Sequence, residues 1–366
     1  MKVASSNTGI VFSNTIRGVS SSLLNAFVCF GFIALNLQTD LKIFVVFFTV
    51  SNLLLIILNW GLKDYSVKLF ASQTDTKNVF SKLFSLRISL FFVLGIILAF
   101  VPLDLKALLF ILVFTFFRSG NNVVESYSVS KNKNFAFACV DLISLASLVI
   151  AYLLNFNFSS NYVFYLIICA EILKMLIGFI LFYNELSFQF MNPFSFLKET
   201  KNYFLVAFFS FLLSKADFYI SSLYLGSKEL INYHIYSSLI GLSQVIITAF
   251  FSRQMVIWFK SKEEHFLVDK RRFLAATFFL SAAALPFFYF ITLYFYKFNI
   301  SSTMLVLVFF NLFIYSFLLL EIYLNTHQNK HGVILTGVLI SSTINVLLSF
   351  IFIRFFDVLG AISLIL

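Results

Sequence analysis

Apolar runs of about 20 residues recur along the whole chain, and short segments between them carry most of the polar residues. A run of this length lets an α-helix cross the ~30 Å hydrocarbon layer of a membrane. Only helices and closed barrels satisfy their backbone polar groups in lipid, and a barrel would show alternating segments of about 10 residues. The pattern therefore predicts an all-α polytopic membrane protein with about 12 transmembrane helices.

The runs fall into two sets of six. The first set is expected at residues 19–37, 42–60, 84–101, 105–129, 135–154 and 161–183. The second set is expected at residues 204–225, 231–252, 273–295, 301–324, 332–353 and 358–366. The last run is short, so we expect a half-length or truncated final helix.

Basic residues lie unevenly between these spans. Of the 26 Lys and Arg residues, 17 fall in segments on one side of the membrane, five on the other and four within spans. Cytoplasmic loops carry the excess of Lys and Arg, so the N-terminus is predicted to be cytoplasmic. The net charge of +10 is explained in the same way, and we expect no nucleic-acid partner.

Matching motifs indicate that the two sets are halves of one repeat. Glu125 and Tyr127 near the end of the fourth span correspond to Glu321 and Tyr323 near the end of the tenth. Six spans per half give both halves the same orientation, as in several transporter folds.

The division predicted from this repeat is an N-terminal six-helix lobe (1–183), a linker (184–203) and a C-terminal lobe (204–366). The linker mixes aromatic and basic residues around Pro193, which is typical of a segment lying on the inner membrane surface. An ordinary connector is an equally good interpretation.

Ionisable residues within spans are costly to insert and therefore mark candidate functional sites. Arg118, Asn122 and Glu125 recur at i, i+4 and i+7 on one helical face, with Asn121 alongside. Such a stripe must line a wet cavity or pair with another helix. The other candidates are Asp141, Glu171, Lys174, Lys215, Asp217 and Glu321.

Two alternatives remain open for these groups. Glu171 and Lys174, three residues apart, can neutralise each other on one helix. Glu125 and Glu321 lie close enough to the inner surface to be solvated.

The basic members, Arg118, Lys174 and Lys215, predict a positively lined cavity that suits an anionic substrate such as phosphate. The carboxylates among them suit a proton or Na⁺ whose gradient drives transport. The sequence contains no Walker P-loop and no His or Cys metal motif, so no catalytic site, metal or cofactor is predicted.

Local motifs resemble those of the Wzx-type O-antigen and polysaccharide flippases of the MOP (MATE-like) superfamily. They are Asn59-Trp60-Gly61-Leu62, Lys215-Ala216-Asp217, Tyr224-Leu225-Gly226, Asn232-Tyr233-His234-Ile235-Tyr236 and Gly360-Ala361-Ile362. The chain departs from the family pattern in having Asn232 where many members have Gly.

The resemblance implies transfer of undecaprenyl-pyrophosphate-linked oligosaccharide from the inner to the outer leaflet of the bacterial cytoplasmic membrane, within lipopolysaccharide synthesis. It implies two lobes in a V around a central cavity, and a polysaccharide polymerase and a chain-length regulator as partners. Lys215, Arg118 and Lys174 would attract the pyrophosphate. Asp217, Asp141, Glu125, Glu171 and Glu321 would hold sugar hydroxyls or a coupling cation, beside the polar Asn121 and Asn122.

Two other functions compete with this interpretation. A multidrug or other small-molecule antiporter of the same superfamily is the closer rival, although a cationic cavity disfavours it. A membrane polysaccharide polymerase or glycosyltransferase is the other. We do not expect an enzyme, because the predicted outer loops are only about four to eight residues long.

Overall fold

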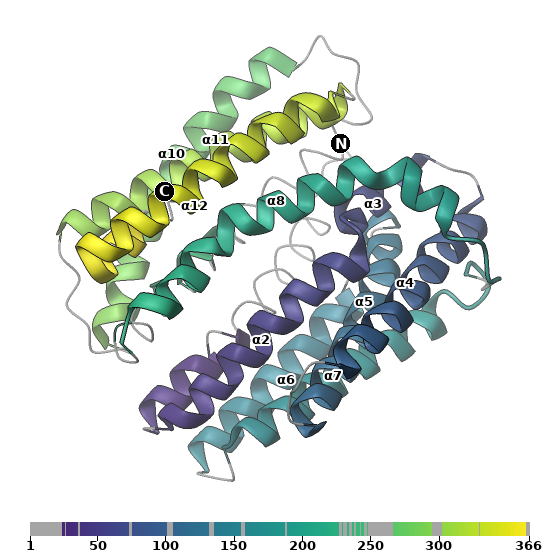
Figure 1. The fold of residues 1–366 in the computed structure, drawn as a ribbon, viewed down its shortest axis with the longest axis horizontal. Coiled ribbons are helices and arrows are strands. Elements are labelled where there is room, and N and C mark those ends of the chain that lie inside the picture. The colour runs from purple at the N-terminus through teal and green to yellow at the C-terminus, as the bar shows by residue number, and fades with distance from the viewer. Residues whose placement is uncertain are drawn as a thin grey trace, which may run out of the picture. The chain divides into compact units, whose positions relative to one another are not determined.

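The computed structural model describes residues 24–247 and 266–363, apart from 26, 36, 73–74, 101–104, 132–134, 155–157, 187–188, 295–301, 329 and scattered positions between 227 and 246. Its regular elements are helices (Figure 1). They are α2 (Gln38–Asn59), α3 (Leu62–Ser72), α4 (Thr76–Ala99), α5 (Leu105–Ser130), α6 (Phe135–Leu153), α7 (Ser160–Leu181), α8 (Phe194–Tyr224), α10 (Phe266–Tyr294), α11 (Ser302–His327) and α12 (His331–Ser363).

Eight helices of the described residues are long and apolar enough to cross a membrane: α2, α4, α5, α6, α7, α10, α11 and α12. Large apolar side chains stand exposed along them, such as Phe92 of α4 and Leu347 of α12, which are 66% and 60% exposed. Such surfaces are stable in contact with lipid tails. The predicted class, an all-α multi-pass membrane protein, is confirmed.

The chain divides into two compact units. The first unit comprises residues 31–208, and the second comprises residues 1–30 together with 209–366. The boundary at residue 208 falls inside α8, so the beginning of this helix belongs to the first unit and the rest to the second.

Helix α5 is the centre of the first unit. It contacts α2, α3, α4 and α7, and it is the most buried of the eight candidate spans (Figure 1). Gly178 of α7 lets these helices approach closely, because a Cβ atom there would lie 2.2 Å from a methyl group of Val124. Close contact of α5 and α7 is what brings their polar side chains together.

The second unit packs α10 against α11 and α11 against α12. Polar side chains connect further segments: the Asn345 amide donates to the Leu213 carbonyl of α8 at 3.1 Å. The Gln244 amide likewise donates to Asn311 of α11 at 3.0 Å.

Two predicted boundaries differ from the structure. The predicted inner loop 61–82 contains α3 and the first residues of α4. The predicted loop at 354–357 is wrong, since α12 runs through it without a break. In both places charged residues lower the hydropathy, but no proline interrupts the helix.

The predicted linker 184–203 is attached to α4. The backbone N–H groups of Gln189 and Met191 donate to the hydroxyl oxygens of Ser81 and Ser85, at 3.1 and 3.0 Å. Helix α8 begins directly after Pro193, whose ring is well suited to a helix start.

A left-handed turn joins α2 to α3. Trp60 and Gly61 have φ angles of 49° and 66°. The Trp60 ring stacks on Phe204, with centroids 4.2 Å apart and an angle of 12° between the planes. A Cβ atom at Gly61 would lie only 2.1 Å from the Tyr203 carbonyl oxygen. The turn therefore requires glycine both for its φ angle and for the close approach of α8.

We predict that Gly61→Ala destabilises the protein by at least about 1–2 kcal/mol, because the new methyl group meets backbone and φ is left-handed. Gly95→Ala is the matched control, since nothing lies within 4 Å of its Cβ position. Thermal unfolding of both purified variants in detergent measures the effect. Equal melting temperatures for Gly61→Ala and the wild type would contradict this account of the turn.

Candidate functional site

Five charged side chains meet inside the first unit. Arg118 Nη1 lies 3.0 Å from Glu171 Oε1 and 3.6 Å from Glu125 Oε1. Lys174 Nζ lies 2.5 Å from Asp141 Oδ1 and 3.2 Å from Glu171 Oε1. Glu171 contacts both cations, so the five groups form one charge network across α5, α6 and α7.

Helical spacing explains how three helices build this network. Arg118 and Glu125 lie seven residues apart on one face of α5, as the sequence predicts. Glu171 and Lys174 lie three apart on α7 and form the predicted neutralising pair. The face of α5 meets that of α7, and Asp141 of α6 completes the coordination of the Lys174 ammonium group.

The network is almost entirely buried. The side chains of Lys174, Glu125, Asp141 and Glu171 are only 2–6% exposed, whereas that of Arg118 is 18% exposed. Charges removed from water this completely require partners, because an unpaired buried ion costs several kcal/mol. Arg118 is thus the one member of the network with appreciable solvent-accessible surface.

The network does not carry a net positive charge. Two cations face three carboxylates, which gives a formal charge of −1 when all five groups are ionised. In the first unit, Arg118 and Lys174 are therefore paired cations and not a free cationic lining. A site with one carboxylate in excess can accept one proton or one monovalent cation.

The two asparagines of α5 belong to different polar groups. The Asn121 amide donates to the backbone oxygen and to Oε2 of Glu171, at 2.6 and 2.7 Å. The Asn122 amide instead donates to Asn59 Oδ1 at 3.2 Å, and the same oxygen accepts a bond from Arg87 Nε at 3.1 Å. Asn121 thus supports the charge network, and Asn122 belongs to a neighbouring group with Asn59 and Arg87.

The remaining predicted site residues lie in the second unit. Asp217 of α8 is buried and accepts a hydrogen bond from the Tyr233 hydroxyl group. Glu321 lies on α11, half-buried, and its backbone oxygen accepts a bond from the Asn325 amide at 2.8 Å. Lys215 lies on α8, but its side chain is outside the described residues.

Sequence reasoning missed Arg87 and Asn59 as site residues. Arg87 lies at the midpoint of the α4 span and is 3% exposed. Its signal was present, because an arginine within a predicted span (84–101) is costly to insert. Asn59 was seen only as part of a motif, and its link between Arg87 and Asn122 depends on packing.

We predict that Lys174→Met destabilises the protein by about 3–5 kcal/mol, because Asp141 and Glu171 then lose a buried cation. Combining Lys174→Met with Asp141→Leu should recover most of this loss, since the double change keeps the formal charge of the network at −1. Lys201→Met, at an exposed position, is the control. Thermal unfolding in detergent measures all three variants, and a double variant no more stable than Lys174→Met would rule out the pairing.

No protein-family model and no curated protein matches the sequence. Solved structures do match. A multidrug resistance MATE family transporter of the MOP superfamily, in an outward-facing conformation, has a TM-score of 0.70 at 13% identity over 98% of this chain and 90% of its own. A MOP superfamily transporter from Pyrococcus furiosus has a TM-score of 0.67 at 14% identity over the same shares. The chain thus has the fold of the MATE transporters.

Proposed function

We propose that this protein is a flippase that moves undecaprenyl-pyrophosphate-linked oligosaccharide from the inner to the outer leaflet of the bacterial cytoplasmic membrane. A MATE-like fold with many membrane-spanning helices supports a transporter of this superfamily. In this proposal the N-terminus lies in the cytoplasm. The flipped oligosaccharide is then the substrate of a polysaccharide polymerase and its chain-length regulator.

The observation that carries the proposal is the solvent accessibility of one cation of the charge network. The one partly exposed member of the network is the guanidinium group of Arg118, at 18%, while the carboxylates of the network are buried. A planar guanidinium binds phosphate oxygens with two parallel hydrogen bonds. An anionic headgroup therefore meets a cation first, although the network as a whole carries an excess carboxylate.

Within this proposal the basic residues have different roles. Lys174 is 2% exposed and holds two carboxylates, so it positions Asp141 and Glu171 and does not contact substrate. Arg118 and Lys215 are the proposed contacts for the pyrophosphate. The isoprenoid tail stays in lipid while rocking of the lobes exposes the headgroup on the other side.

The excess carboxylate provides a means of coupling. A proton or Na⁺ taken up by the network would neutralise its formal charge, and release on the other side would reset it. Asp217 is the proposed counterpart in the second unit, with its hydrogen bond from Tyr233.

A small-molecule or multidrug antiporter is the second candidate. The net negative charge of the network favours it, and one similar solved structure is a multidrug resistance MATE transporter. A cationic drug would be attracted by the carboxylates, but it would first meet the Arg118 guanidinium. Transport assays with both classes of substrate separate the two functions.

We expect Arg118→Ala and Lys215→Ala each to reduce surface polysaccharide at least tenfold in the producing cell, because each removes a proposed contact with the pyrophosphate. The membrane level of Lys215→Ala, measured by immunoblot, should equal that of the wild type. Export by Arg118→Ala is divided by its own membrane level, because this change also removes a partner of the buried Glu125 and Glu171. Lys201→Ala, an exposed lysine earlier on α8, is the matched control and should export normally. Normal export by Arg118→Ala would remove this residue from the substrate site.

Glu125→Gln should uncouple transport from the ion gradient, because it brings the network to two cations and two carboxylates. Its contact with Arg118 is the longest ion pair of the network at 3.6 Å, so the fold should tolerate the change. Transport by reconstituted protein is measured with and without an imposed proton or Na⁺ gradient. Equal stimulation of wild type and variant by the gradient would show that Glu125 plays no part in coupling.

A further inference from the structure

Arg87 is a buried cation that has no carboxylate partner among the described residues. No acidic side chain in the described part of the chain forms an ion pair with it, and its one hydrogen bond runs from Nε to Asn59. Nη1 and Nη2 are both buried and donate to nothing. This differs from Arg118, whose guanidinium group lies between two glutamates.

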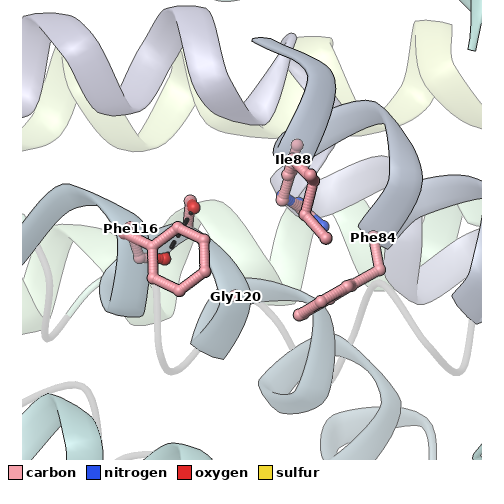
Figure 2. Close-up of a pocket in the computed structure, with 6 residues that line it drawn as sticks. Phe84, Ile88, Phe116 and Gly120 are labelled. Atoms are coloured by element: carbon pink, nitrogen blue, oxygen red, sulfur yellow. Dashed lines mark hydrogen bonds between the residues drawn. The ribbon is translucent and has the colours of Figure 1, made fainter. Parts of the chain in front are cut away.

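Arg87 is one of the residues that line a pocket between α4 and α5. Figure 2 shows Phe84 and Ile88 of α4 on one side of it and Phe116 and Gly120 of α5 on the other. The Ser119 hydroxyl group also lies in the wall, where it donates to the Phe116 carbonyl oxygen at 2.9 Å. The wall is otherwise apolar or aromatic, so the charge of the guanidinium group is poorly screened within it.

The charge of this site favours binding of an anion. A buried guanidinium group whose two terminal nitrogens donate to no described residue carries a desolvation cost that neutral walls do not offset. The free nitrogens present N–H donors in a fixed fork that matches an anion. A water molecule would accept hydrogen bonds there but would leave the positive charge uncompensated.

The small volume of the pocket favours a small anion. It has room for about one particle the size of a water molecule. A halide ion is only slightly larger than that, whereas phosphate carries four oxygens around its central atom. A sugar pyrophosphate is larger still.

We propose that Arg87 binds one halide ion, chloride in the cell, at this pocket between α4 and α5. The ion compensates the guanidinium charge and fixes the Arg87–Asn59–Asn122 group, which joins α4, α2 and α5. The site is separate from the charge network and does not depend on which substrate is transported.

The first test follows the melting temperature of the purified protein as sodium chloride replaces sodium gluconate at constant ionic strength. A bound ion should raise the melting temperature of the wild type by several degrees and then saturate. Arg87→Gln should show no such rise, and Arg87→Lys should need more chloride. Arg354→Gln changes an exposed arginine of the second unit and should respond like the wild type.

Several results would overturn the proposal. They are a melting temperature insensitive to chloride in the wild type, the same chloride response in Arg87→Gln, or stabilisation by inorganic phosphate in place of chloride. If Arg87→Gln fails to fold, a crystal of the wild type grown in sodium bromide decides. An anomalous bromide peak within hydrogen-bond distance of Nη1 or Nη2 supports the site, and a water or no peak there refutes it.

Discussion

A charge placed inside a lipid bilayer must find a partner within the protein, and this constraint organises the first unit. Helix α5 carries Arg118 at its centre and Glu125 two turns further on, so it must be surrounded by helices that supply counter-charges. Helices α6 and α7 supply them through Asp141, Glu171 and Lys174. The close contact at Gly178 brings α7 near enough for these pairs to form.

The same constraint connects stability to the proposed transport. In the proposed mechanism, the paired network keeps the three helices together as one body while the protein changes conformation. Because it has one carboxylate in excess, a proton or cation can enter it without breaking every pair. In the proposed mechanism, the network is the rigid element that responds to the gradient, and Arg118 is its proposed point of contact with the substrate.

Much of the fold could be predicted from hydropathy alone. The span predicted at 135–154 is observed as Phe135–Leu153, and that predicted at 105–129 as Leu105–Ser130. Helix α3 was not predicted, because Lys63, Asp64 and Lys68 give it the average hydropathy of a loop. Hydropathy identifies what can enter lipid, but a short polar helix at the surface has no such signal.

The residues of the candidate site could be predicted from the sequence, but the ion pairs between helices could not. Helical spacing correctly put Arg118 and Glu125 on one face and Glu171 beside Lys174. It could not show that Glu171 also pairs with Arg118, since this contact depends on how α5 packs on α7. For the same reason the sequence suggested that cations line a cavity. In the first unit these cations are instead paired with carboxylates. The division into lobes at 1–183, 184–203 and 204–366 stays a prediction, as does the placement of Lys215.

The central claim is that this MATE-like protein moves a lipid-linked anionic glycan. It is tested most directly with the purified protein in liposomes that carry a fluorescent undecaprenyl-pyrophosphate oligosaccharide, by following access of the glycan to an added glycosidase. The account predicts rapid, protein-dependent exposure of the inner-leaflet glycan and no uptake of a cationic dye. Uptake of the dye without any movement of the glycan would contradict it and establish the antiporter instead.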